Sequence, residues 1–294
     1  MAKRVGWLRA QALINKNGTE LHPRLKMPAG AAGTQGDTNI IIGKNGDPAG
    51  DANPYEDPHA TQKYPLGTKL IDGDRTFRYV RAAGTGIFRS QLVQAPIPHT
   101  HVLDKEPAAN AAVGATEVSV TIGALGVGKD HYKGGYFHVN DGTGEGQYLR
   151  IAGNAALAGA GALTITLYDP LYKAIATTDS KIDLFINQYG SGDTSDHSLS
   201  GPQWALTTRL YPIIGVGVRS MTVRQYGWIQ TGGPCSVLTE GTVVRTKMAV
   251  QSNTTKGAIE AQDISDAALN QVVGWVVMAG GDGEYSVIHL TLAD

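Results

Sequence analysis

Short runs of alternating apolar and polar residues recur along most of the chain. In Glu117–Ile122, the valines and the isoleucine fall on one face, while Glu117, Ser119 and Thr121 fall on the other. A period of two is the pattern of a strand with one buried face. The same reasoning predicts strands at Ile40–Ile42, Arg75–Arg81, Leu163–Tyr168, Ile182–Ile186, Met221–Gln230, Thr242–Val250, Gln271–Met278 and Tyr285–Leu292.

Helical periodicity is rare by comparison. Phe88 and Leu92 are four residues apart and predict a short helix over Ile87–Val93, and a second is expected over Ser265–Asn270. Glycine-rich segments separate the predicted strands at short intervals. The pattern therefore predicts a mainly β fold with few short helices, built as short-stranded β-barrel or β-sandwich blocks.

The predicted strands are unevenly distributed, which suggests three regions. Residues 1–66 are rich in Gly, Pro, Ala, Asn and Asp and contain one predicted strand, so we expect a long extended N-terminal arm. A segment of this length without regular structure is typical of chains that wrap around partners. A β-rich middle domain is expected over 67–201 and a barrel-like C-terminal domain over 202–294.

The amino-acid composition also favours a folded, mainly β protein. The chain of 294 residues contains 38 Gly, only 17% charged residues and 41% hydrophobic residues. High glycine with little Glu or Lys argues against a mainly helical protein, and the hydrophobic share argues against wholesale disorder. No Gly-x-y repeat is present, which excludes a collagen-like fibre.

Charge is balanced over the whole chain but not along it. The formal net charge is −1, so no global field attracts nucleic acid or a membrane, and we expect neither as a partner. The first 26 residues are nevertheless basic, with Glu20 as their one acidic residue. They form either a solvated terminus or an arm that docks on an acidic partner surface, with nucleic-acid contact as a weaker alternative. The candidate interface residues are Lys3, Arg4, Trp7, Arg9, Lys16, Arg24 and Lys26.

Two glycine-rich motifs are candidates for ligand chemistry. Gly123–Asp130 matches G-x-x-x-x-G-K, but Asp130 occupies the position where a P-loop needs Ser or Thr, and no helical pattern follows. Asn140–Gly146 contains oxygen ligands without the spacing of a calcium loop, which leaves a weak cation site as the alternative. We interpret both as turns between strands.

The remaining reactive residues form no recognisable constellation. His99 and His101 would share a strand face, but neither they nor His131 and His138 have a metal-site spacing. Cys235 is the single cysteine, which excludes an internal disulfide and fits a reducing compartment, and we expect a buried, unreactive thiol in a loop. We therefore predict no enzyme, no catalytic residue, no metal and no cofactor.

Membrane and export signals are also not expected. The N-terminus lacks a cleavage-like end, and the longest apolar run, which starts at Val272, is shorter than the ~20 residues that span a bilayer. Trp228 and Trp275 lie in apolar runs and are expected in the core, with an interface as the alternative.

Three stretches together resemble structural proteins of tailed double-stranded DNA bacteriophage virions, including minor capsid proteins and head decoration or cement proteins. They are Gly67–Gly86, Gly134–Asn154, and the C-terminal run from Val223–Leu238 through Asn270–Leu292. The similarity is one of overall pattern and leaves residues 1–66 uncovered.

This resemblance implies a non-enzymatic protein that is made in the host cytoplasm and binds the outside of the capsid. Its partners would be the major capsid protein and further copies of itself, as a homotrimer that clamps neighbouring capsomers. Two other functions stay open. One is a head fibre, neck or tail component, and the other is a host- or glycan-binding module that uses the glycine-rich loops around Asp141 and Glu145.

Overall fold

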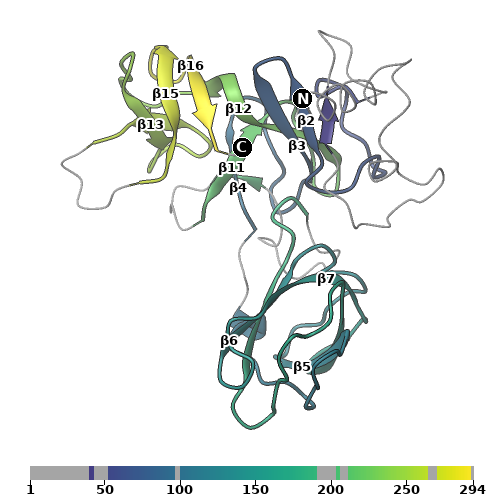
Figure 1. Cartoon of the computed structure of the whole chain (residues 1–294). Helices are drawn as coiled ribbons and strands as arrows, with labels where there is room; N and C mark the ends of the chain where they lie inside the picture. The colour runs from purple at the N-terminus through teal and green to yellow at the C-terminus, as the bar shows by residue number, and fades with distance from the viewer. Residues whose placement is uncertain are drawn as a thin grey trace, which may run out of the picture.

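The computed structural model confirms a mainly β protein. It describes residues 40–42, 52–96, 100–190, 203–205, 211–263 and 270–292. Figure 1 shows two lobes, each built on its own antiparallel sheet. The one helical element among these residues is a 3-10 turn, Thr100–Val102. No helix in this part of the chain is long and apolar enough to cross a membrane.

The large sheet forms the upper lobe of Figure 1. Its main path runs in the order β1-β2-β3-β12-β16-β15-β13-β14, and all pairs except the parallel β1–β2 pair are antiparallel. β4 and β11 pair with each other, while β10 joins β4 and β11 joins β12. The strands are β1 (Ile40–Ile42), β2 (Lys69–Asp72), β3 (Arg75–Arg81), β4 (Leu92–Gln94), β10 (Gln203–Trp204), β11 (Ile213–Gly217), β12 (Tyr226–Leu238), β13 (Met248–Gln251), β14 (Ile259–Ala261), β15 (Val272–Met278) and β16 (Tyr285–Thr291).

The long strand β12 organises this lobe. Its first half pairs with β3 and its second half with β16, and the register shifts near Gly232. At Gly233 the backbone has φ +81°, and a Cβ there would lie 2.1 Å from the Asp74 carbonyl oxygen. Glycine is therefore required where β12 passes the β2–β3 turn. The described strands form an open sheet, so the expected barrel-like closure of this region is not observed.

The small sheet forms the lower lobe of Figure 1, in the order β5-β8-β7-β6-β9. Apolar side chains from its inner faces build one core that includes the fully buried Phe137 and Ile165. The strands are β5 (Glu117–Ile122), β6 (Tyr136–Asp141), β7 (Tyr148–Asn154), β8 (Gly161–Leu167) and β9 (Lys181–Phe185).

Strand pairing divides the chain differently from the expected boundaries. β2, β3 and β4 pair within the large sheet, whereas the expected middle domain grouped them with the small sheet. The small lobe is thus an insertion between β4 and β10. Part of the expected arm also belongs to the large lobe, because Tyr64 and Leu66 pack against its aromatic core of Phe77, Tyr79 and Trp228. The expectation that Trp228 is a core residue is confirmed.

The expected helix over Ile87–Val93 is wrong. Ile87 forms an isolated bridge with Met221, and Leu92 already belongs to β4. Between them Ser90 has φ +56°, a left-handed conformation that interrupts an α-helix. Similar interruptions at Arg224 (φ +70°) and Thr246 (φ +68°) make β12 and β13 begin later than the apolar pattern predicts. The helix expected over Ser265–Asn270 lies outside the described residues, apart from Asn270.

Candidate functional site

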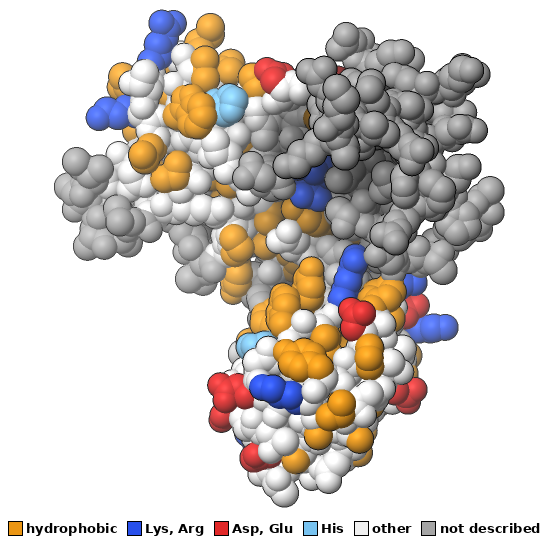
Figure 2. Space-filling view, viewed as in Figure 1, with side chains coloured by type: hydrophobic (Ala, Val, Ile, Leu, Met, Phe, Trp, Pro, Cys, Tyr) orange, Lys and Arg blue, Asp and Glu red, His pale blue; other side chains and the backbone are white. Residues whose placement is uncertain are grey.

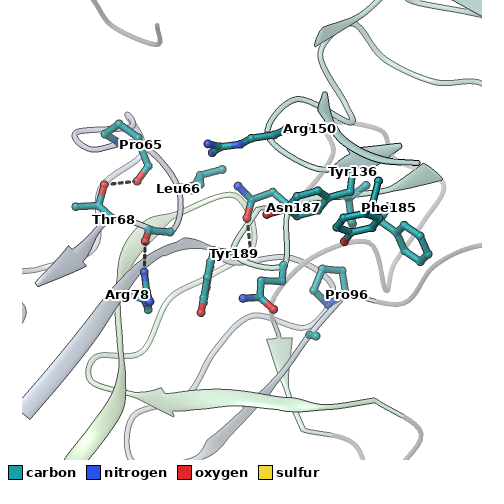
Figure 3. A pocket seen from close by; sticks show the side chains of 16 residues that line it. Pro65, Leu66, Thr68, Arg78, Pro96, Tyr136, Arg150, Phe185, Asn187 and Tyr189 are labelled. Atoms are coloured by element: carbon teal, nitrogen blue, oxygen red, sulfur yellow. Dashed lines mark hydrogen bonds between the residues drawn. The ribbon is translucent and has the colours of Figure 1, made fainter. Parts of the chain in front are cut away.

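A cleft of about 580 Å³ lies at the junction of the two lobes. Figure 3 shows that its walls come from both sheets and from the chain that leaves β9. Aromatic rings, prolines, amides and two arginines line it. The residues that define its character are Arg78, Tyr136, Tyr148, Arg150, Asn187 and Tyr189.

The register of β6 and β7 builds the small-lobe wall. Tyr136 pairs with Arg150, and His138 pairs with Tyr148, so these four side chains share the outer face of the sheet. Tyr136 and Tyr148 are diagonal neighbours whose rings stack, with centroids 4.6 Å apart and an interplanar angle of 12°. They remain 38% and 54% exposed, respectively. The result is an exposed aromatic pair on a rigid sheet.

Arg150 places a cation beside this pair. Its guanidinium carbon lies 5.6 Å from the centroid of the Tyr168 ring, which fixes its orientation by a cation–π contact. The Nε atom is buried and has no hydrogen-bond partner among the described residues. In Figure 3 the side chain extends across the cleft toward Leu66. An arginine that lines a cleft is suited to binding an oxygen-rich ligand through its guanidinium group.

The large-lobe wall is held by a chain of contacts. Arg78 Nη1 donates a hydrogen bond to the Gly67 carbonyl at 3.0 Å, and the guanidinium carbon lies 5.7 Å from the centroid of the Tyr189 ring. The Tyr189 backbone N–H donates to Asn187 Oδ1 at 2.9 Å, which orients the Asn187 amide. Burial raises the pKa of the Tyr189 phenol, so this ring is neutral at physiological pH. The wall is therefore positioned before any ligand arrives.

Gly67 allows the wall to pack this closely. Its φ is +84°, and a Cβ there would lie 2.9 Å from Cδ2 of Tyr189. Both the left-handed backbone and the ring contact therefore favour glycine.

A second exposed feature lies on the large sheet, and we call it the outer apolar face. Cross-strand register aligns Pro234, His289, Trp275 and Met248 across four strands. The Trp275 and His289 rings stack with centroids 4.4 Å apart. Figure 2 shows orange side chains and a histidine gathered over β15 and β16. Further exposed apolar residues on these strands are Val272, Val277, Met278 and Tyr285.

The expectation that Trp275 is a core residue is therefore wrong. Alternation along β15 turns Val276 inward and leaves Trp275 45% exposed, while a register shift between Val272 and Gly274 lets Val273 be buried as well. A bulge between Val276 and Met278 then brings Val277 and Met278 to the surface together. The apolar run predicted the strand correctly but did not indicate which of its faces is buried.

The two glycine-rich motifs are turns between strands, as predicted. In Gly123–Asp130, Asp130 has φ +59°, and its N–H donates to the Asn154 carbonyl. In Asn140–Gly146, Asp141 Oδ1 accepts the Gly142 N–H at 2.8 Å. No group of three or more His, Cys, Asp or Glu side chains that could hold a metal ion occurs in the described ranges, at these motifs or elsewhere.

The described histidines belong to no group of three or more possible metal ligands. His101 is buried in the 3-10 turn, not on a strand, and His99 lies outside the described residues. His131 is buried against the Tyr132 ring, and His138 Nδ1 lies 3.4 Å from Asp183 Oδ2.

Cys235 is a buried thiol, as predicted, but it lies on β12 and not in a loop. Burial raises its pKa to about 12, so the thiol is protonated and unreactive in the folded protein.

The predicted interface residues Lys3, Arg4, Trp7, Arg9, Lys16, Arg24 and Lys26 lie outside the described residues. The cleft was not predicted from the sequence. Tyr136, Tyr148 and Arg150 nevertheless lie within Gly134–Asn154, one of the three stretches that carry the resemblance. Their alternation on two adjacent predicted strands was the available signal.

No family model matches this chain, and no curated protein or solved structure matches it either.

Proposed function

We propose that this chain is a structural protein of a tailed double-stranded DNA bacteriophage virion. It would act as a decoration or cement protein that binds the outside of the capsid shell and stabilises contacts between capsomers. The resemblance of its three stretches to such proteins suggests the class. The observation that carries a binding role is the outer apolar face, because monomeric proteins rarely expose a contiguous apolar patch of this kind.

A second copy of this chain is the occupant that we propose for the outer apolar face. Its centre contains no Lys, Arg, Asp or Glu, whereas nearby loops carry both signs, with Arg245 and Lys247 on one and Asp282 and Glu284 on the other. A patch with an apolar centre and a mixed-charge rim is compatible with itself. Three copies that turn this face toward a common threefold axis would bury Trp275 and Met248 around that axis and form the expected homotrimer.

The basic arm would supply the contact with the major capsid protein. Its lysines and arginines suit an acidic shell surface, and many weak contacts on one particle add up through avidity. Attachment should therefore weaken as salt screens these charges.

Trp275→Ser tests the oligomer, with Val113→Ser as the matched control. Val113 is 63% exposed on the small lobe and lies outside the outer apolar face. By sedimentation velocity, wild type and Val113→Ser should be trimers, whereas Trp275→Ser should shift toward monomers without a change in circular dichroism. A monomeric wild type, or an unchanged Trp275→Ser trimer, would refute the proposed occupant.

Quantitative mass spectrometry of purified virions tests the location. A decoration protein should be present in a number of copies comparable to that of the capsomers. A few copies per particle would instead indicate a head fibre, neck or tail component, and absence would refute a virion role.

Deleting residues 1–26 should reduce the number of copies bound to each particle while both lobes stay folded. An unchanged number of bound copies would refute the docking role of the arm.

A further inference from the structure

We infer that the cleft between the lobes is a binding site for a saccharide that carries a carboxylate. The inference is independent of the proposed attachment to a capsid, because it uses neither the outer apolar face nor the basic arm.

The exposed aromatic pair indicates a ligand with a flat apolar side. Tyr136 and Tyr148 stack on each other, and both line the cleft from paired strands of the small sheet. A pyranose ring has one face of C–H groups that packs on such a surface, while its rim carries hydroxyls. Rings held in place on two paired strands lose little conformational freedom when a ligand binds.

The polar groups around the pair match the rim of a sugar. The Asn187 amide is oriented by its hydrogen bond from the Tyr189 N–H. Gln188 also lines the cleft and is exposed. Amide groups can donate to and accept from hydroxyls, which both donate and accept. The lining of the cleft combines rings and prolines with oriented polar groups, and its volume of about 580 Å³ lies within the 300–1,000 Å³ that is typical of small-molecule sites.

The charge of the lining selects an acidic sugar. Arg78 and Arg150 both line the cleft, and no aspartate or glutamate does so among the residues described. Arg78 Nη1 donates to the Gly67 carbonyl and its guanidinium lies by the Tyr189 ring, whereas the guanidinium of Arg150 lies by the Tyr168 ring. A ligand carboxylate would supply acceptors for the Arg150 guanidinium.

Single-stranded nucleic acid is the competing ligand class, because bases also stack on tyrosines beside arginines. The cleft is a local cavity of about 580 Å³ with two cationic side chains, and not a long basic groove that follows a phosphate backbone. These dimensions favour one or two sugar rings.

Binding of the full chain to a matched pair of sugars tests the inference. Methyl β-D-glucuronide and methyl β-D-glucoside differ only in the carboxylate, and saturation-transfer NMR with titration would measure both. An array of acidic and neutral saccharides widens the search, and oligo-dT serves as the nucleic-acid probe. We expect acidic saccharides to bind about tenfold or more tightly than their neutral counterparts, which is the scale of a charged hydrogen bond.

Two variants and their controls separate the roles of the residues. Tyr148→Ala should abolish detectable binding of both sugar types, whereas Tyr285→Ala, at a 53% exposed tyrosine of the other lobe, should not. Arg150→Gln should remove the preference for the carboxylate, while Arg245→Gln should keep it. Thermal unfolding of each variant checks that the fold is intact. The inference is refuted if no acidic saccharide on the array binds, if Arg150→Gln keeps the preference, or if only oligo-dT binds.

Discussion

The two sheets of this protein present opposite kinds of outer surface. The small sheet exposes a tyrosine pair beside Arg150, where each ring has a polar neighbour and the surface is hollowed into a cleft. The large sheet exposes a row of apolar residues centred on Trp275. A hollow with a few oriented polar groups suits a small ligand, whereas an apolar face suits a macromolecular surface. The two proposals therefore place ligand binding in the cleft between the lobes and assembly on the large sheet.

The two lobes have separate hydrophobic cores. Phe137 is fully buried in the core of the small lobe, which shares no residue with the clusters of the large lobe. Phe137→Ala should destabilise the small lobe by about 3–5 kcal/mol, because it removes a large ring and leaves a cavity. Calorimetry should show one transition lowered and the other unchanged. A single transition that shifts as a whole would mean that the lobes unfold as one unit.

A smaller effect is expected in the large lobe alone. Gly233→Ala should cost about 1–3 kcal/mol, because it places a Cβ against the Asp74 carbonyl and strains a left-handed backbone. Gly73→Ala is the matched control, since Gly73 also has a positive φ (+62°) but has open space around its Cβ position. Chemical denaturation should show the larger loss for Gly233→Ala. Equal losses would show that the close approach to Asp74 contributes nothing.

The smallest expected loss of stability depends on pH and comes from Cys235. Burial raises the Cys235 pKa from 9.0 to about 12, so the folded state disfavours the thiolate. Below pH 9 the Cys235 thiol is protonated in both states, so it leaves the free energy of unfolding independent of pH. Between pH 9 and about 12 the thiol ionises in the unfolded chain but stays protonated in the folded protein. The large lobe should then lose up to about 1.4 kcal/mol per pH unit. Cys235→Ala should lack this part of the loss when both proteins are unfolded at pH 8 and pH 10. Identical pH dependence in the two proteins would contradict the burial of the thiol.

The strands were largely predictable from the sequence, and the division into lobes was not. Alternation identified β5 because the polarity of each residue in Glu117–Ile122 indicates which face of the strand it lies on. It could not reveal that β3 pairs with β12, since that contact joins Phe77 to Gln230 across more than half of the chain. The cleft could not be predicted for the same reason, because it also depends on contacts between segments that are far apart in the sequence. Tyr136 and Tyr148 become neighbours only through the register of β6 and β7, and Arg78 reaches the cleft from the other lobe.

The outer apolar face shows a related limit. Trp275 lies in an apolar run whose composition indicates burial, yet a β strand has two faces and this one leaves Trp275 45% exposed. The bulge after Val276 moves two further apolar residues outward. Sequence pattern predicts that a segment is a strand more reliably than it predicts what covers each side of it.

The insertion of the small lobe between β4 and β10 has an evolutionary consequence. The large sheet keeps its strand order whether or not that segment is present, because no strand of the small sheet pairs with it. A lineage could therefore gain, lose or exchange the inserted lobe through a single recombination event. The small-lobe wall of the cleft would then change while the outer apolar face of the large sheet stays the same.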